Sequence, residues 1–296
     1  MEKESKAVAI ALGTFDGLHL AHQKVLNSAL AAKAPGGAVC VTFETPPMRK
    51  SGGLLLQPEL KKQMLYEMGF KRVISLNFSA VRNLSAKEFL DLLKNRYCAE
   101  SLSCGYDYTF GKNAAGKVSD LIQYCRENGL SANIIEPVSF GGSPISSTAI
   151  RKYIETGNPK MAASLLGRPF LFEAAVTKGD RRGRTIGFPT INQRLPSGMT
   201  VPRFGVYASR CTVNGRTYLG VTNFGIRPTY QLKIPRAETF LIGFEGDLYE
   251  KHLRLELLDF RRPEKKFDSL EQLKSAISND TEAIKMGDYS EFNFRP

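Results

Sequence analysis

Residues 8–22 read Val-Ala-Ile-Ala-Leu-Gly-Thr-Phe-Asp-Gly-Leu-His-Leu-Ala-His, a short apolar run followed by a turn and the start of a helical pattern. The apolar run, Val8 to Leu12, is typical of a buried strand, and the helical pattern extends from about Leu18 to Lys33. A strand that leads through a glycine-containing turn into a helix is a building unit of parallel α/β sheets. This stretch therefore predicts an α/β fold for the first part of the chain.

Further apolar runs alternate with helical patterns up to about residue 136. The run at 38–43, like Val8 to Leu12, is almost unbroken, which indicates parallel strands buried on both faces. The predicted strands span 38–43, 72–77, 100–104 and 131–136, and the predicted helices span 59–68, 86–97 and 117–127. Ser85 and Glu88 have the spacing of a capping box for the second of these helices. A Rossmann-like sheet is expected here.

Two short helices are predicted in the middle of the chain, at 146–157 and 158–167. Hydroxyl residues precede the first helix, a proline begins the second, and a glycine ends each of them. The character of the sequence changes directly afterwards. We therefore expect two domains, 1–158 and 159–296.

Beyond Phe170 the sequence consists of short alternating segments that are typical of β-strands. Asn214-Gly215 lies between two of them and is a strong signal for a hairpin turn. An amphipathic helix is predicted from Ser269 to Ile277. The second domain is expected to be an all-β barrel or sandwich with a C-terminal helix.

The composition is that of a globular protein. The chain has 296 residues and a net charge of +12, and its five cysteines are scattered without C-x-x-C spacing. No apolar run approaches the roughly 20 residues that a membrane helix requires. We expect a cytoplasmic monomer or weak homo-oligomer with no membrane partner. The charge indicates an anionic partner; because the Lys and Arg residues are spread along the chain, we expect phosphorylated small molecules and no nucleic acid.

His19 and His22 follow the first strand directly. On a helix, residues i and i+3 share a face, and the N-terminus of a helix already favours phosphate. With Gly13 and Gly17, whose missing side chains let a backbone approach a ligand, the turn has the features of a polyphosphate site. The same pair could instead be half of a metal site or two surface histidines without a function.

The segment Gly-Thr-Phe-Asp-Gly-Leu-His-Leu-Ala-His-Gln at 13–23, together with Ile-Ser-Ser-Thr-Ala-Ile-Arg at 145–151, resembles the paired motifs of bacterial bifunctional riboflavin kinase/FAD synthetases. The resemblance implies that the first domain transfers the adenylyl group of ATP to FMN and releases pyrophosphate. It implies that His19, His22 and Arg151 are catalytic. The implied ATP-binding residues are Gly13, Phe15, Asp16, Gly17, Ser146, Ser147 and Thr148.

The segment from Cys104 to Gly111 resembles the glycine-aromatic segment near the flavin in the same family. Asp107 and Phe110 are the flavin-binding candidates that this resemblance implies. A strand end with buried aromatic side chains would explain the segment as well. The chain departs from the family pattern at Ala21 and Thr45, and the second departure bears on the flavin pocket.

A second resemblance, to riboflavin kinases, covers about 168–280 and centres on Gly-Phe-Pro-Thr-Ile-Asn at 187–192. It implies that Glu238 is the base that accepts the proton of the riboflavin 5′-hydroxyl. The other implied roles are Mg²⁺ binding by Thr190 and Asn192, with Asn192 also catalytic, ATP binding by Gly179 and Arg184, and flavin binding by Arg262 and Phe267. A salt bridge and a core aromatic would also account for the last two residues.

The two resemblances imply consecutive steps of FAD synthesis, with ATP as co-substrate, Mg²⁺ as cofactor, and riboflavin, FMN and FAD as substrates and products. Two alternatives remain at this stage. One is a different small-molecule nucleotidylyltransferase, and the other is a non-catalytic basic protein that binds flavin or RNA.

Overall fold

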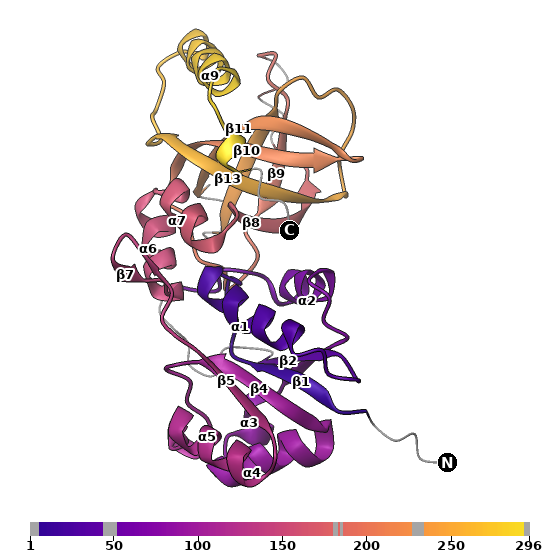
Figure 1. Cartoon of the computed structure of the whole chain (residues 1–296). Coiled ribbons are helices and arrows are strands. Elements are labelled where there is room, and N and C mark those ends of the chain that lie inside the picture. Colours follow the sequence, from indigo (N-terminus) through magenta and orange to yellow (C-terminus); the bar gives the residue numbers. More distant parts are fainter. Residues whose placement is uncertain (1–5, 44–51, 180–182, 184–185, 227–233, 293–296) are drawn as a thin grey trace. The chain divides into compact units, whose positions relative to one another are not determined.

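The computed structural model describes residues 6–43, 52–179, 183, 186–226 and 234–292 (Figure 1). Their contacts form two compact units. The first contains 6–43 and 58–147, and the second contains 52–57 and the described residues from 148 onwards.

The first unit is built on a five-stranded sheet in the order β3-β2-β1-β4-β5. Every pairing in this sheet is parallel. The order and direction are those of a Rossmann-like fold, as predicted. The strands are β1 (Val8–Leu12), β2 (Ala38–Phe43), β3 (Arg72–Leu76), β4 (Ala99–Gly105) and β5 (Ser131–Ile135).

Helices cover both faces of this sheet: α1 and α2 lie on one side, and α3, α4 and α5 on the other (Figure 1). β1 is buried along its whole length, which explains why its sequence is an unbroken apolar run. The helices are α1 (Leu20–Ala31), α2 (Pro58–Glu67), α3 (Phe78–Val81), α4 (Ala86–Asp91) and α5 (Val118–Glu127).

The predicted helix at 86–97 has two parts. Its capping box is confirmed, since the Ser85 hydroxyl accepts from the Glu88 N–H and the Glu88 carboxylate accepts from the Ser85 N–H. After α4, however, the chain continues as a π-helical turn, Leu92–Arg96. The sequence analysis also missed α3 and a small ribbon of two-residue strands, β6 (Ser139–Phe140) and β7 (Ser143–Pro144).

The two short helices at the predicted boundary are present as α6 (Ser147–Thr156) and α7 (Pro159–Leu166). Asn158 caps α7 by accepting from the Met161 N–H, and Gly167 ends it in the left-handed conformation. The first residue of α6, Ser147, belongs to the first unit, while the rest of this helix belongs to the second.

The second unit is a closed barrel with strand order β10-β11-β12-β9-β8-β13, which resolves the predicted choice between barrel and sandwich. Asn214 and Gly215 form the β10–β11 hairpin turn with positive φ, as predicted. The strands are β8 (Phe170–Thr177), β9 (Thr190–Arg194), β10 (Gly205–Val213), β11 (Arg216–Ile226), β12 (Pro235–Leu241) and β13 (His252–Arg262).

The C-terminal helix α9 (Leu270–Lys285) packs against β11 (Figure 1). It begins where the sequence predicts, with the Ser269 hydroxyl accepting from the Gln272 N–H, but it extends eight residues beyond the predicted end at Ile277. A 3₁₀ turn, Ser290–Phe292, follows it.

Residues 52–57 precede α2 in sequence, yet they are part of the second unit. Leu55 and Leu56 are buried, and Leu54 forms a bridge with Met199. The Gln57 side chain bonds both backbone groups of Glu173 on β8, accepting from its N–H at 2.7 Å and donating to its carbonyl at 3.0 Å. A segment from the first half of the sequence therefore stabilises the barrel.

Leu55→Ala is expected to destabilise the second unit, because it leaves a cavity beside the barrel. Large-to-small substitutions of buried leucine cost about 2–5 kcal/mol of unfolding free energy. Hydrogen exchange resolved by mass spectrometry should show faster exchange in β8–β13, and the exposed Met286→Ala control should show no change. Faster exchange confined to β1–β5 would contradict this assignment.

Candidate functional site

In the first unit, a cavity of about 400 Å³ opens at the carboxyl ends of β1, β4 and β5. In a parallel sheet of this order, the chain proceeds from β1 towards one edge of the sheet and later returns to add strands on the other side of β1. Ligands bind at the carboxyl ends of the strands, at this point of reversal. The cavity is lined by 12–15, His19, 21–22, Val25, Phe43, 105–109, 135–138 and 144–147.

The turn after β1 has an unusual backbone. Phe15 and Leu18 both have positive φ, 48° and 47°, and Gly17 has a φ of 85°. Positive φ is costly for residues with side chains and is often found at functional sites. A Cβ on residue 13 would lie 2.8 Å from the Phe15 ring, so Gly13 is required for the packing of that ring. Asp16 and Gly17 are buried in the turn.

The two histidines share one face, as predicted, but His19 does not lie within the helix. It is the N-cap of α1, and its Nδ1 accepts from the backbone N–H of His22 at 3.3 Å. Because Nδ1 accepts, the ring proton of neutral His19 lies on Nε2, which can donate to a phosphate. The two rings stack with centroids 3.5 Å apart, and the Phe15 ring packs edge-on against His22.

Ser146 and Ser147 both line the cavity. The buried Ser147 hydroxyl donates to the Asp16 carbonyl at 3.0 Å, so this side chain fixes the turn. Thr148 and Arg151 follow on α6 and belong to the second unit. Arg151 is buried there, and its Nε donates to the Gly53 carbonyl at 2.6 Å.

The glycine-aromatic segment lies only partly at the cavity. Asp107 lines it, together with Tyr106, Tyr108 and Thr109. Phe110 instead is buried in the core of the first unit, where its ring packs against Phe89. The aromatic side chains that this segment places at the cavity are therefore Tyr106 and Tyr108 rather than Phe110, because Phe110 is needed to fill the core.

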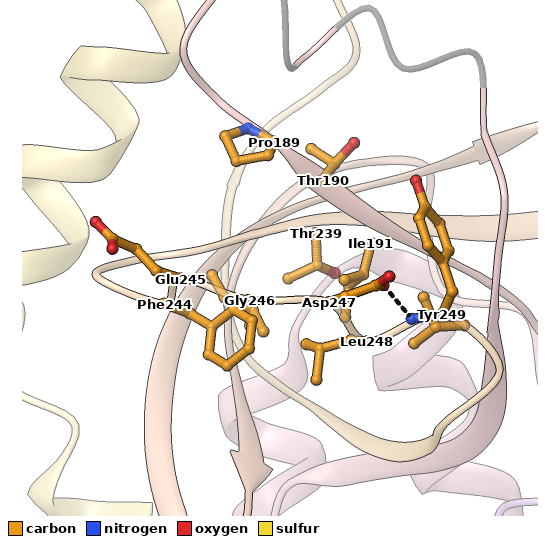
Figure 2. Close-up of a pocket in the computed structure, with 12 residues that line it drawn as sticks. Pro189, Thr190, Ile191, Thr239, Phe244, Glu245, Gly246, Asp247, Leu248 and Tyr249 are labelled. Atoms are coloured by element: carbon orange, nitrogen blue, oxygen red, sulfur yellow. Dashed lines mark hydrogen bonds between the residues drawn. The ribbon is translucent and has the colours of Figure 1, made fainter.

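The described residues of the second unit form two cavities that Thr190 lines. One cavity, of about 290 Å³, is bounded by Ile191, Thr239 and the loop 244–249 (Figure 2). The other, of about 380 Å³, is lined by Glu238, Asn223 and residues of α9. Thr239 lines the smaller cavity and Glu238 the larger one. Because neighbouring residues of a strand point to opposite faces, the two cavities lie on opposite faces of β12.

Glu238 lies between two asparagines. The strand register pairs it with Asn192 on β9 and with Asn223 on β11, and its side chain is partly exposed. Asn192 is buried, and within the described part of the chain no group donates to its Oδ1. A Cβ on residue 179 would lie 2.5 Å from the Asn192 Nδ2, so Gly179 makes room for this amide.

The sequence analysis missed the loop 244–249, which forms a wall of the smaller cavity (Figure 2). The Asp247 carboxylate accepts from the Tyr249 N–H at 2.9 Å and fixes the bend of this loop. Asp247-Leu-Tyr249 lies within the segment that resembles riboflavin kinases, and this resemblance could have pointed to the loop. Asn223, which donates to Glu264 at 3.1 Å, was missed as well.

Arg262 and Phe267 line the larger cavity of the second unit. The Arg262 guanidinium donates to Asp280 of α9 at 2.8 and 3.1 Å and lies 5.8 Å from the centre of the Phe267 ring. The salt bridge that was the alternative explanation for Arg262 is therefore present, and it ties α9 to β13. Arg184 lies outside the described residues.

Comparison with known proteins finds a family match in each half of the chain. The FAD synthetase family matches residues 1–149, and the riboflavin kinase family matches residues 166–286. The bifunctional riboflavin kinase/FMN adenylyltransferase of Listeria monocytogenes is 33% identical over 92% of this chain and 89% of its own length. The chain belongs to the bifunctional riboflavin kinase/FMN adenylyltransferase family. The members from Bacillus subtilis and Escherichia coli, each 33% identical, match 96% and 92% of the chain and 93% and 90% of their own lengths.

A solved structure from Streptococcus pneumoniae, described as a macrolide-efflux protein, has the same fold as the present chain. It is 30% identical, with a TM-score of 0.86, and the match covers 97% of this chain and 96% of the other. Among the residues that the structure describes, no helix has the length and apolar character needed to cross a membrane.

Proposed function

We propose that this chain makes FAD from riboflavin in two ATP-dependent steps. The barrel phosphorylates riboflavin, and the Rossmann-like unit adenylylates the resulting FMN. The observation that carries the proposal is that each family match falls on a unit with cavities of its own. A nucleotidylyltransferase of another kind would leave the barrel and its matched residues without a function.

For adenylyl transfer, the FMN phosphate attacks the α-phosphorus of ATP and pyrophosphate leaves. Because this nucleophile is already anionic near neutral pH, the step needs alignment and charge stabilisation rather than a base. We assign this role to His19 and His22, which stack at the cavity. The family resemblance adds Arg151, which lies on α6 in the second unit. The turn 13–17 and the hydroxyl residues 146–148 hold the ATP phosphates, and Asp107 contacts the flavin.

For phosphoryl transfer, Glu238 accepts the proton of the riboflavin 5′-hydroxyl, a weak nucleophile that benefits from a base. Riboflavin occupies the cavity beside Glu238, Arg262 and Phe267, and ATP occupies the one beside the loop 244–249. The family resemblance adds Gly179 and Arg184 as ATP-binding residues. Thr190 lines both cavities, which supports a position for it where the γ-phosphate meets the hydroxyl.

Mg²⁺ fits the donors of the barrel site. The Asn192 Oδ1 is a buried oxygen to which no group of the described residues donates, and a hard cation takes such oxygens. Thr190 and Asn192 would hold the ion, which would neutralise phosphate charge. We keep 1–158 and 159–296 as the domains for the two steps, although 52–57 and 148–158 pack with the second unit. The chain acts in the cytoplasm as a monomer or weak homo-oligomer, without nucleic acid or membrane partners.

The proposal is tested by following labelled phosphate from ATP in the presence of Mg²⁺. Label in the γ-phosphate should enter FMN, and label in the α-phosphate should enter only FAD. Removing Mg²⁺ with a chelator should stop FMN formation. Binding of riboflavin without transfer of either label would favour a non-catalytic flavin-binding protein.

A further inference from the structure

Lys61 on α2 brings a positive charge to the ends of two strands. Its Nζ donates to the Thr14 carbonyl at 3.1 Å, to the Thr42 hydroxyl at 3.1 Å and to the Phe43 carbonyl at 3.4 Å. Thr14 follows β1, while Thr42 and Phe43 end β2. Thr14 and Phe43 both line the cavity of the first unit. One ammonium therefore connects the two backbone segments that border this cavity.

The Thr14 carbonyl accepts two hydrogen bonds from side chains. The buried Thr42 hydroxyl donates to it at 3.0 Å, in addition to the bond from Lys61. Two residues further on, the Asp16 carbonyl accepts from Ser147. The strained residue Phe15 thus lies between two anchored carbonyls. Positive φ at a residue with a side chain persists only where surrounding contacts enforce it, and these contacts do so.

The pKa of Lys61 depends on its burial and on two nearby groups. Burial lowers the pKa of the Lys61 ammonium, while charges at Cys40 and Asp16 act in the opposite direction. Burial raises the pKa of Cys40 to about 12, so this thiol is neutral at physiological pH. The charge at Asp16 thus favours the charged form of Lys61, the form whose ammonium donates to the Thr14 carbonyl.

We propose that Lys61 is a positioning residue for adenylyl transfer. It holds the Thr14 and Phe43 carbonyls, and in this way it fixes the turn that binds the ATP phosphates. Its side chain acts through Thr14 and Phe43, which line the cavity. The inference rests on the proposal that ATP binds in this cavity for adenylyl transfer.

The test is the Lys61→Met variant of the full chain, which keeps most of the length of the side chain and removes its charge. The KM for ATP in FMN adenylylation should rise and kcat should fall. We expect kcat/KM for ATP to decrease by about 10- to 100-fold, the factor associated with a hydrogen bond from a charged group. Lys61→Arg, which keeps the charge and the donors, should recover most of the loss.

Two controls separate positioning from folding. Lys62→Met changes the exposed neighbour on the same helix and should leave the KM for ATP unchanged. Riboflavin phosphorylation, measured on the same Lys61→Met molecules, should also be unchanged. If Lys61→Met lowers only the melting temperature and the active fraction, with a normal KM for ATP, the proposal is wrong. A wild-type chain that forms no FAD would refute the proposed function itself, before any variant is compared.

Discussion

The His22→Ala variant is expected to convert riboflavin to FMN at the normal rate and to stop there. His22 stacks on His19 at the cavity of the first unit, where we propose that it donates to the phosphate charge that develops during adenylyl transfer. Removing one such donor from a preorganised site costs about 10²–10³-fold in kcat. Chromatography of the flavins during turnover should show FMN accumulating while FAD stays near the background.

The matched control is His252→Ala, which removes an exposed histidine from β13. It should leave both steps unaffected. An equal loss of FMN and FAD formation in His22→Ala would mean that the substitution unfolds the chain or that the two steps share one site. Either result would contradict the assignment of His22 to adenylyl transfer alone.

Glu238→Gln should have the reverse effect. The glutamine keeps the size of the side chain beside Asn192 and Asn223 but cannot accept the proton of the riboflavin hydroxyl. Loss of a general base typically costs about 10²–10⁴-fold. FMN formation should fall by this factor, whereas FMN that is supplied directly should still be converted to FAD at the wild-type rate.

Glu282→Gln on α9 serves as the control, because this carboxylate is exposed and pairs only with the nearby Lys285 among the ion pairs of the described chain. Its effect on phosphorylation should be negligible. Near-normal FMN formation by Glu238→Gln would show that Glu238 is an ordinary strand residue and that the base lies elsewhere.

The sequence predicted the features that depend on local patterns. Buried parallel strands such as β1 need apolar residues on both faces, so the sheet could be recognised from unbroken runs such as Val8–Leu12. The capping box at Ser85 and the hairpin at Asn214-Gly215 depend on a few neighbouring residues and were also found. The histidine pair and Thr190, which the two family motifs contain, line cavities of the structure.

Features that depend on distant contacts could not be predicted in this way. Residues 52–57 pack with the barrel because Gln57 bonds Glu173, which lies 116 positions away in the chain. Phe110 has the sequence context of a flavin contact, but the core of the first unit needs its ring. Lys61 looks like a surface residue of an amphipathic helix until the ends of β1 and β2 are seen beside its ammonium.

Mixing the two inactive variants tests most directly whether the chain carries two independent sites. Neither His22→Ala nor Glu238→Gln alone should form appreciable FAD from riboflavin and ATP. Equal amounts of both in one reaction should form it, because FMN released by the first variant is adenylylated by the second. If the mixture forms no more FAD than the separate variants do, while each keeps its remaining activity, the account of two self-sufficient sites is wrong.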